Sequence, residues 1–211
     1  MPGNSPVLMD GFLICSGRLI HVRGKLFLVL GGTRSGKSEF AEKIAGQLGQ
    51  RVVYLATAAA EDDEMAERIK LHRKRRPKNW ETVEEPREIL KVLQKSRAGD
   101  VFLLDCLTFW IANLLAENDL KNGRKKLADD RSHIIDRVND LAGVVEKGVN
   151  MVVVSSEVGL GLVPENPLGR KFRDLTGKAN QILAKKADKV FFTIAGIPVE
   201  LKKLASEGGM E

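Results

Sequence analysis

Five short runs of apolar residues recur along the chain from residue 25 onward, and longer mixed segments separate them. The runs cover residues 26–30, 52–56, 101–105, 151–155 and 190–195, and their apolar residues are continuous rather than alternating. Continuous apolar runs are typical of strands buried on both faces, as in parallel sheets covered by helices. The pattern therefore predicts an α/β fold, with a mostly parallel sheet and helices on both of its faces.

The segments between these runs are predicted to be helices. They cover residues 37–48, 62–76, 87–95, 107–117, 125–146 and 168–186. The last segment carries one apolar stripe at spacings of three and four residues, which is typical of a helix packed on a core. We predict that this stripe is buried; it consists of Leu168, Phe172, Leu175, Ala179, Ile182 and Leu183.

The start of the chain stands apart from this repeating order. Residues 1–24 contain two short apolar runs, 12–15 and 18–22, with Ser16 and Gly17 between them. These runs fit a β-hairpin and equally a loosely held extension, and no chemistry is assigned to them. Because the chain has 211 residues and a domain has roughly 150, we predict one domain over residues 25–204 and a tail over 205–211.

Composition and charge narrow the class of protein. Hydrophobic residues make up 43% and charged residues 29% of the chain, which is ordinary for a globular protein and excludes wholesale disorder. The net charge of +6 favours an anionic partner, either phosphate or nucleic acid. Cys15 and Cys106 lack the spacing of a zinc site and fit a reducing cytoplasm. No apolar run approaches the roughly 18 residues of a membrane span, and no secretion signal begins the chain, so we expect a cytoplasmic protein.

The most specific local signal is a phosphate-binding loop directly after the first apolar run. It matches G-x-x-x-x-G-K-[ST] and consists of Gly31, Gly32, Thr33, Arg34, Ser35, Gly36, Lys37 and Ser38. In such a loop the glycines allow backbone N–H groups to surround phosphate oxygens, and the lysine reaches the outer phosphates. The Ser38 hydroxyl, at the positive end of the following helix, is a candidate Mg²⁺ ligand.

A second Mg²⁺ ligand is expected at the end of a neighbouring strand. The run 101–105 ends in Asp105, which is therefore the candidate carboxylate. The alternative is that Asp105 caps the helix that begins near Leu107.

A strongly basic segment follows an acidic one in the predicted helix 62–76. Between residues 68 and 78, seven of eleven residues are Lys or Arg, and His72 lies among them. One interpretation is a solvent-exposed helix whose charges suit its dipole. The other is that the cations face nucleotide phosphates and that His72 is a nucleophile or an acid–base group. We expect no function for His21 or His133.

A nucleotide site by itself leaves several reactions open. A guanine-specific switch is disfavoured, because the fragment at 185–188 lacks the Asn or Thr of the Asn/Thr-Lys-x-Asp motif. A small-molecule P-loop kinase remains an alternative. So does a nucleic-acid-binding module that uses residues 68–78 and 121–126, although 5% aromatic residues offer little for base stacking.

Several separated segments together resemble one enzyme family, the bifunctional adenosylcobinamide kinase/adenosylcobinamide-phosphate guanylyltransferases of cobalamin biosynthesis. The resemblance covers about residues 26–202, and residues 1–25 precede the usual start of the family. Ser156 and Leu71 depart from it, standing where members commonly have Asn and where some have a second His. Besides the loop, the matching segments are 54–57, 62–65, 68–69, His72, 76–77, Trp80, 105–108, 113–115, 157–164, Arg170, 172–174, Gly177, 180–181, 187–188 and 196–198.

The resemblance implies a RecA-like P-loop NTPase domain with two activities. In the first, ATP or GTP phosphorylates the aminopropanol hydroxyl of adenosylcobinamide. In the second, the family's histidine, matched by His72, attacks the α-phosphorus of GTP and releases pyrophosphate. It then carries GMP to adenosylcobinamide phosphate, and the product is adenosylcobinamide-GDP.

The resemblance also implies roles for individual residues. Lys37 and His72 are the expected catalytic residues, and Ser38 and Asp105 the expected Mg²⁺ ligands. Glu157, Arg173 and Asp174 are expected to support the site. The family implies a homotrimer with small-molecule substrates and without a nucleic-acid partner. Outside the loop, further nucleotide contacts are expected at Ala56, Thr57, Ala58, Arg73, Lys74, Arg75, Arg76, Glu84 and Asp105.

Overall fold

The computed structural model describes residues 7–9, 12–15, 18–58, 67, 73, 76–122 and 129–208. Within these ranges the main sheet has seven strands in the order β10-β9-β4-β8-β7-β5-β6. Neighbouring strands are parallel, except that β10 at one edge is antiparallel to β9. The prediction of a mostly parallel sheet is confirmed. The strands are β4 (Leu26–Gly31), β5 (Val52–Ala56), β6 (Glu81–Glu84), β7 (Val101–Asp105), β8 (Asn150–Ser156), β9 (Lys189–Ile194) and β10 (Ile197–Glu200).

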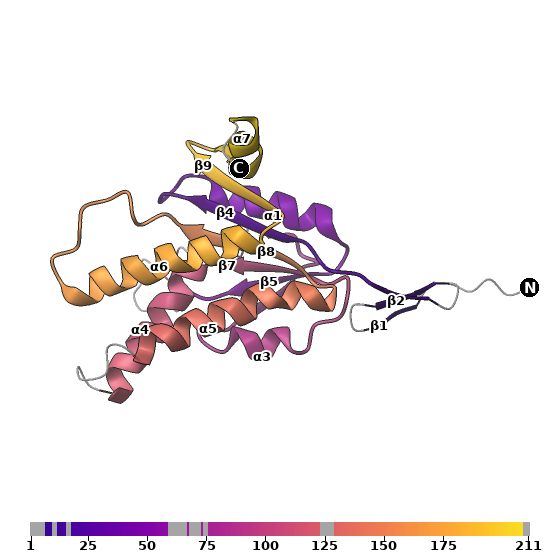
Figure 1. Cartoon of the computed structure of the whole chain (residues 1–211), viewed down its shortest axis with the longest axis horizontal. Coiled ribbons are helices and arrows are strands. Elements are labelled where there is room, and N and C mark those ends of the chain that lie inside the picture. Colours follow the sequence, from indigo (N-terminus) through magenta and orange to yellow (C-terminus); the bar gives the residue numbers. More distant parts are fainter. Residues whose placement is uncertain are drawn as a thin grey trace, which may run out of the picture.

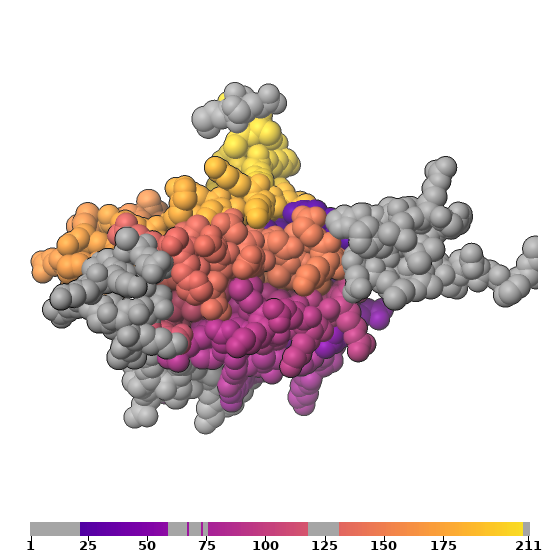
Figure 2. All heavy atoms as spheres, turned by 60° about the horizontal axis from the view of Figure 1, so that its bottom comes forward, coloured from indigo at the N-terminus to yellow at the C-terminus, as the bar shows by residue number. Residues whose placement is uncertain are grey.

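Helices cover both faces of this sheet, as the apolar runs predict (Figure 1). One face packs against α1 (Lys37–Leu48). The other packs against α3 (Ile89–Leu93), α4 (Leu107–Asn122), α5 (Asp129–Gly143) and α6 (Pro167–Lys186). Figure 2 shows α5 and α6 side by side on the surface, and the short 3-10 helix η2 (Val144–Lys147) follows α5. None of the helices in the described ranges has the length and apolarity needed to cross a membrane.

Two apolar clusters form the core, one on each face of the sheet. Val29, Ile44 and Tyr54 belong to the cluster under α1. The larger cluster, under the other helices, includes Trp110, which is fully buried. Its indole N–H donates to the carbonyl oxygen of Arg87 at 2.8 Å, so the polar end of this side chain is satisfied.

Helix α6 shows how local sequence sets an element. Asn166 precedes the helix, and its side chain accepts a hydrogen bond from the Gly169 N–H. In the predicted stripe, the side chains from Phe172 to Leu183 are buried or packed against the core. Leu168 is a wrong prediction, since it is 44% exposed. It lies in the first turn of α6, which extends beyond the carboxyl edge of the sheet (Figure 1).

Element ends differ from the prediction in several places. Helix α3 is shorter than 87–95, α4 continues beyond 117, and α5 ends at Gly143 instead of continuing to 146. The predicted strand 190–195 ends at Ile194, because Ala195 has a positive φ of 49° and begins a tight turn. Strands β6 and β10 and helix α7 (Leu201–Glu207) were not predicted. Both missed strands lie at sheet edges, where the apolar signal is weak. The predicted helix 62–76 lies mostly outside the described residues.

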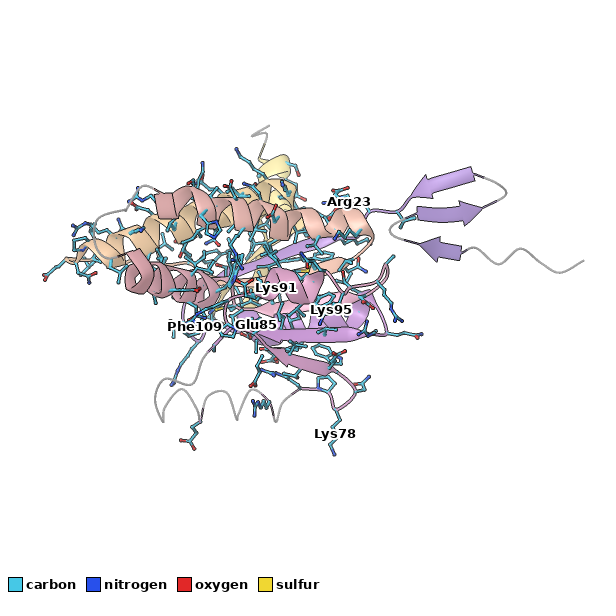
Figure 3. All side chains as sticks on the ribbon, turned by 90° about the horizontal axis from the view of Figure 1, so that it is seen from below. Arg23, Lys78, Glu85, Lys91, Lys95 and Phe109 are labelled. Atoms are coloured by element: carbon cyan, nitrogen blue, oxygen red, sulfur yellow. The ribbon has the colours of Figure 1, made fainter. Side chains whose placement is uncertain are left out.

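The start of the chain forms a separate antiparallel sheet of β1 (Val7–Met9), β2 (Phe12–Cys15) and β3 (Arg18–His21). Cys15 pairs with Arg18 in the antiparallel register of β2 and β3. This sheet projects away from the amino-terminal edge of the main sheet (Figure 1). Arg23 lies where the small sheet joins the main domain (Figure 3). The Arg23 guanidinium donates to Asp188 at 3.0 Å and to Glu146 at 3.1 Å. These two ion pairs attach the segment between β3 and β4 to the main domain.

Candidate active site

The phosphate-binding loop connects β4 to α1 at the carboxyl edge of the sheet. Lys37 and Ser38 begin α1, and the backbone N–H groups and the dipole at the start of a helix favour anions. The Lys37 ammonium folds back over the loop and donates to the Gly32 carbonyl at 2.9 Å. The loop residues Thr33 and Arg34 are exposed, so phosphate can approach from solvent.

The turn between β9 and β10 contacts the phosphate-binding loop at Ser35 and Gly36. The Gly196 N–H donates to the Ser35 carbonyl at 2.9 Å, which holds that carbonyl against the turn. Gly36 has a φ of +89°, and a Cβ built there would lie 3.1 Å from the Gly196 Cα. Both the backbone angle and this close approach therefore require glycine at position 36.

The two expected Mg²⁺ ligands come from neighbouring elements that end at the same edge. Ser38 lies in the first turn of α1, and Asp105 is the last residue of β7, against which α1 packs. A hydroxyl and a carboxylate suit Mg²⁺, which binds oxygen ligands and takes the remaining ones from phosphates and water. The donor set therefore fits the metal that the loop implies.

Tyr54 fixes one oxygen of the Asp105 carboxylate. The Tyr54 hydroxyl donates to Asp105 Oδ2 at 2.5 Å from the neighbouring strand β5. Burial, and then the charge of Asp105, raise the pKa of Tyr54 above its ordinary value, so this hydroxyl keeps its proton. Over the face of the ring, the Arg76 guanidinium carbon lies 3.4 Å from the ring centroid, a cation–π contact.

Arg73 and Glu84 form the second part of the candidate site. The Arg73 guanidinium pairs with the Glu84 carboxylate at the end of β6, and its Nε–Oε1 distance is 2.9 Å. Together with Thr82, this pair lines an open cavity of about 510 Å³. Arg76 reaches the same strand through a long 3.5 Å hydrogen bond to the Thr82 hydroxyl. Lys78, in contrast, points into solvent (Figure 3).

The segment after β5 was expected to contact nucleotide. Ala56 and Thr57 are buried, and Ala58 is half-buried. The Thr57 hydroxyl donates to the Cys106 carbonyl at 2.7 Å and accepts from the Cys106 N–H at 2.8 Å. The Thr57 carbonyl accepts from the Asn113 side chain at 2.8 Å. Thr57 thus joins the ends of β5 and β7, and Ala58 is the more accessible of these residues.

Cys106 follows Asp105 but is not a reactive thiol. Burial above all, and then the Asp105 charge, raise the pKa of the Cys106 thiol to about 11, although Lys37 acts in the opposite direction. A thiol with that pKa stays protonated at neutral pH and is a poor nucleophile.

Other expected site residues are placed less centrally or not at all. Glu157 accepts a hydrogen bond from the Gly159 N–H at 2.6 Å, and its own N–H donates to the Gly31 carbonyl at 3.0 Å. Arg173 is half-buried and Asp174 exposed on α6. Of the expected site residues in the basic segment, Arg73 and Arg76 are described, whereas His72, Lys74 and Arg75 lie outside the described residues.

Two residues of this region were missed as contributors when the sequence was considered alone. Tyr54 and Asn113 each lie in a segment that matches the family, but no role was assigned to either residue. The available signal for Tyr54 was that it is the only tyrosine of the chain and interrupts an aliphatic strand. Asn113 links the Thr57 and Pro86 carbonyls, a contact that sequence spacing does not reveal.

A mostly parallel α/β sheet with a G-x-x-x-x-G-K-[ST] loop at a helix start and a carboxylate on a nearby strand end defines a P-loop nucleotide-binding protein. A comparison with models of protein families shows to which family of P-loop proteins this chain belongs. The model of the cobinamide kinase / cobinamide phosphate guanyltransferase family matches residues 27–201, and the chain belongs to this family. The resemblance drawn from the motifs is thereby confirmed.

Known proteins of similar sequence are named as bifunctional adenosylcobalamin biosynthesis proteins. The bifunctional adenosylcobalamin biosynthesis protein CobP of Pseudomonas aeruginosa is 42% identical over 176 residues, 83% of this chain and 96% of that protein. The corresponding CobU of Salmonella typhimurium is 40% identical over 186 residues, 84% of this chain and 99% of that protein. Among solved structures, the RadB recombinase has a TM-score of 0.44 and 14% identity, covering 81% of this chain and 74% of that one. This last likeness is too distant to bear on function.

Proposed function

We propose that this protein phosphorylates adenosylcobinamide and then transfers GMP from GTP to adenosylcobinamide phosphate, through a guanylyl group on His72. The observation that carries the proposal is the position of Arg73 and Arg76. Arg73 follows His72 directly in the sequence, and Arg76 comes three residues later. Arg73 pairs with Glu84, the last residue of β6, and Arg76 contacts the ring of Tyr54 in β5. Both strands end at the same sheet edge as the phosphate-binding loop. Family membership supplies the substrates.

In the kinase step, the triphosphate lies on the loop and the acceptor hydroxyl attacks the γ-phosphorus. Lys37 and the backbone N–H groups at the start of α1 stabilise the charge that develops on the phosphoryl oxygens. Mg²⁺ held by Ser38 and Asp105 neutralises phosphate charge when bound. ATP and GTP both fit this chemistry, because the loop contacts phosphates and not the base.

In the guanylyl step, a neutral His72 nitrogen attacks the α-phosphorus of GTP, a P–N bond forms and pyrophosphate leaves. The phosphate oxygen of adenosylcobinamide phosphate then attacks the same phosphorus, and the imidazole leaves. Arginines beside the nucleophile in the sequence suit both halves, because cations stabilise the charge on a phosphoryl transition state. A covalent intermediate divides the transfer into two easier displacements.

Intact-protein mass spectrometry tests the covalent step. After incubation with GTP and Mg²⁺, we expect the wild type to gain an acid-labile adduct of the mass of GMP, and His72→Asn to gain none. The matched control is His133→Asn, because His133 is an exposed histidine on α5 and lies far from the phosphate-binding loop in the sequence. This control variant should form the adduct as the wild type does.

Activity assays test the division of labour between the two steps. Lys37→Ala should lose both reactions, because the triphosphate no longer binds productively. His72→Asn should lose guanylyl transfer and retain phosphorylation of adenosylcobinamide. Equal loss of both reactions in both variants contradicts the proposal. A wild type that binds GTP and stays unmodified would point instead to a plain small-molecule kinase.

We also propose that the enzyme is a cytoplasmic trimer, as the family resemblance implies. In support, the β9–β10 hairpin and α7 expose Ile194, Ile197 and Leu204, each more than half accessible in the single chain. Ile194 and Ile197 are partners in the register of this hairpin, and exposed apolar side chains that lie together favour contact with another protein surface. Light scattering coupled to size-exclusion chromatography measures the mass in solution, and a monomer contradicts the trimer.

A further inference from the structure

Tyr54 connects two parts of the candidate site that come from distant segments of the chain. Its hydroxyl reaches the Asp105 carboxylate at 2.5 Å, and its ring lies against the Arg76 guanidinium at 3.4 Å from the ring centroid. The side chain is only 1% exposed. Its position is therefore fixed by the packing between the sheet and α1.

The hydroxyl is the part of Tyr54 that packing does not require. A phenylalanine would fill nearly the same apolar space, and burying a hydroxyl costs free energy unless a hydrogen bond compensates for it. Here the compensating partner is the Asp105 carboxylate. A carboxylate with one oxygen held in this way presents its other oxygen in a defined direction, as the partners of metal ligands commonly ensure.

The ring has a separate task. Arg76 is only half-exposed, although it belongs to the basic segment, because its guanidinium lies over the ring of Tyr54. Arg76 is four residues after His72 in the sequence.

We propose that Tyr54 is a positioning residue with two separable functions: its hydroxyl orients Asp105 for Mg²⁺, and its ring holds the Arg76 guanidinium in place. This inference rests on the proposed function, which assigns the metal to Asp105 and the guanylyl group to His72. The hydroxyl then affects both reactions through the metal. The ring affects guanylyl transfer alone.

Two substitutions separate the functions. Tyr54→Phe removes the hydroxyl and keeps the ring, and Tyr54→Leu removes both. For Tyr54→Phe we expect about tenfold weaker Mn²⁺ binding in the presence of a non-hydrolysable GTP analogue, the usual size of effect for a partner of a metal ligand. The Mg²⁺ concentration for half-maximal rate should rise similarly in both reactions, while the KM for GTP at saturating Mg²⁺ stays as in the wild type.

Tyr54→Leu should show the same loss of metal affinity and one further defect. At saturating Mg²⁺ its GMP adduct should form more slowly than in Tyr54→Phe, while phosphorylation of adenosylcobinamide proceeds at the same rate in the two variants. Arg76→Ala tests the same contact from the other side. It provides the measurement for the ring should Tyr54→Leu fail to fold.

A spectroscopic readout is available because Tyr54 is the only tyrosine of the chain. Protein labelled with ¹³C at tyrosine Cζ gives a single NMR signal that senses the hydroxyl hydrogen bond. Addition of Mg²⁺ to the complex with the GTP analogue should move this signal in the wild type and leave it in place in Asp105→Asn. A merely structural tyrosine would not respond to the metal.

Two results would overturn the inference. One is Mn²⁺ affinity in Tyr54→Phe that equals that of the wild type. The other is adduct formation in Tyr54→Leu and Arg76→Ala as fast as in Tyr54→Phe. Failure of the proposed function is a different result, in which the wild type catalyses neither reaction. The Mn²⁺ and NMR measurements need no turnover and still decide the role of the hydroxyl in that case.

Discussion

Replacement of Gly36 by alanine tests the structural account of the phosphate-binding loop. Gly36 has a φ of +89° and immediately precedes α1. A Cβ at this position would lie 3.1 Å from the Gly196 Cα and 3.8 Å from the Thr193 Cγ2. Gly196 is part of the turn that holds the Ser35 carbonyl, so the strain would fall on the contact that supports the loop.

The expected cost follows from these two observations. A left-handed backbone costs an L-residue about 1–2 kcal/mol. The close approach to a backbone atom adds to this, whereas alanine recovers about 0.4–1 kcal/mol through the lower entropy of the unfolded chain. The net destabilisation is about 1–2 kcal/mol, and each kcal/mol lowers the Tm by about 2–4 °C in a protein of this size.

Thermal unfolding without nucleotide measures this cost, and Gly32→Ala is the matched control. Gly32 lies in the same loop, but a Cβ there meets no atom within 4 Å. We expect Gly36→Ala to unfold at a lower temperature than both the wild type and Gly32→Ala. GTP with Mg²⁺ should raise the Tm of the wild type and not of Gly36→Ala, because binding to the native state stabilises it. A Gly36→Ala protein as stable as Gly32→Ala would refute the reasoning.

Two further substitutions test the framework of the site. Thr57→Val should lower the free energy of unfolding by about 1–3 kcal/mol, because it leaves the buried Cys106 N–H without its acceptor. Thr57→Ser keeps the hydroxyl and should not lower it. Urea titration measures both values, and equal stability of the two variants would contradict this prediction. The pKa of Asp188 is lowered because hydrogen bonds from the Leu26 N–H and Arg23 outweigh the effect of burial. This group therefore stabilises the fold above its unfolded pKa of about 3.9 and loses that contribution as the pH falls through the lower folded value. Asp188→Asn should accordingly destabilise the protein at neutral pH and progressively less in acid, and a difference independent of pH would contradict this.

Much of the fold was predictable because its signals are local. The continuous apolar runs mark β4, β5, β7, β8 and β9, since strands buried on both faces need apolar residues at every position. The phosphate-binding loop needs a fixed spacing of glycines, lysine and serine within one turn, so a short stretch of sequence defines it. The family segments added substrates and residue roles, which no periodicity contains.

Other elements were not predictable from local pattern. The edge strand β6 is mostly exposed and has the sequence Glu-Thr-Val-Glu, so its position depends on pairing with β5. Strand β10 contains Pro198 and is likewise held by its neighbour. Leu168 has the spacing of a buried residue, but the sheet ends before it can be covered.

The sequence alone thus determined the parallel sheet, the loop that binds phosphate and the set of candidate residues, because each depends on neighbouring positions in the chain. Only the tertiary structure decided which of them meet. Tyr54 contacts Asp105 because β5 and β7 are adjacent in the sheet, although 51 positions separate them in sequence. Gly196 reaches the loop for the same reason, since β9 lies beside β4. Strand order results from the packing of the whole core, and it brings distant residues together where no local pattern records their contact.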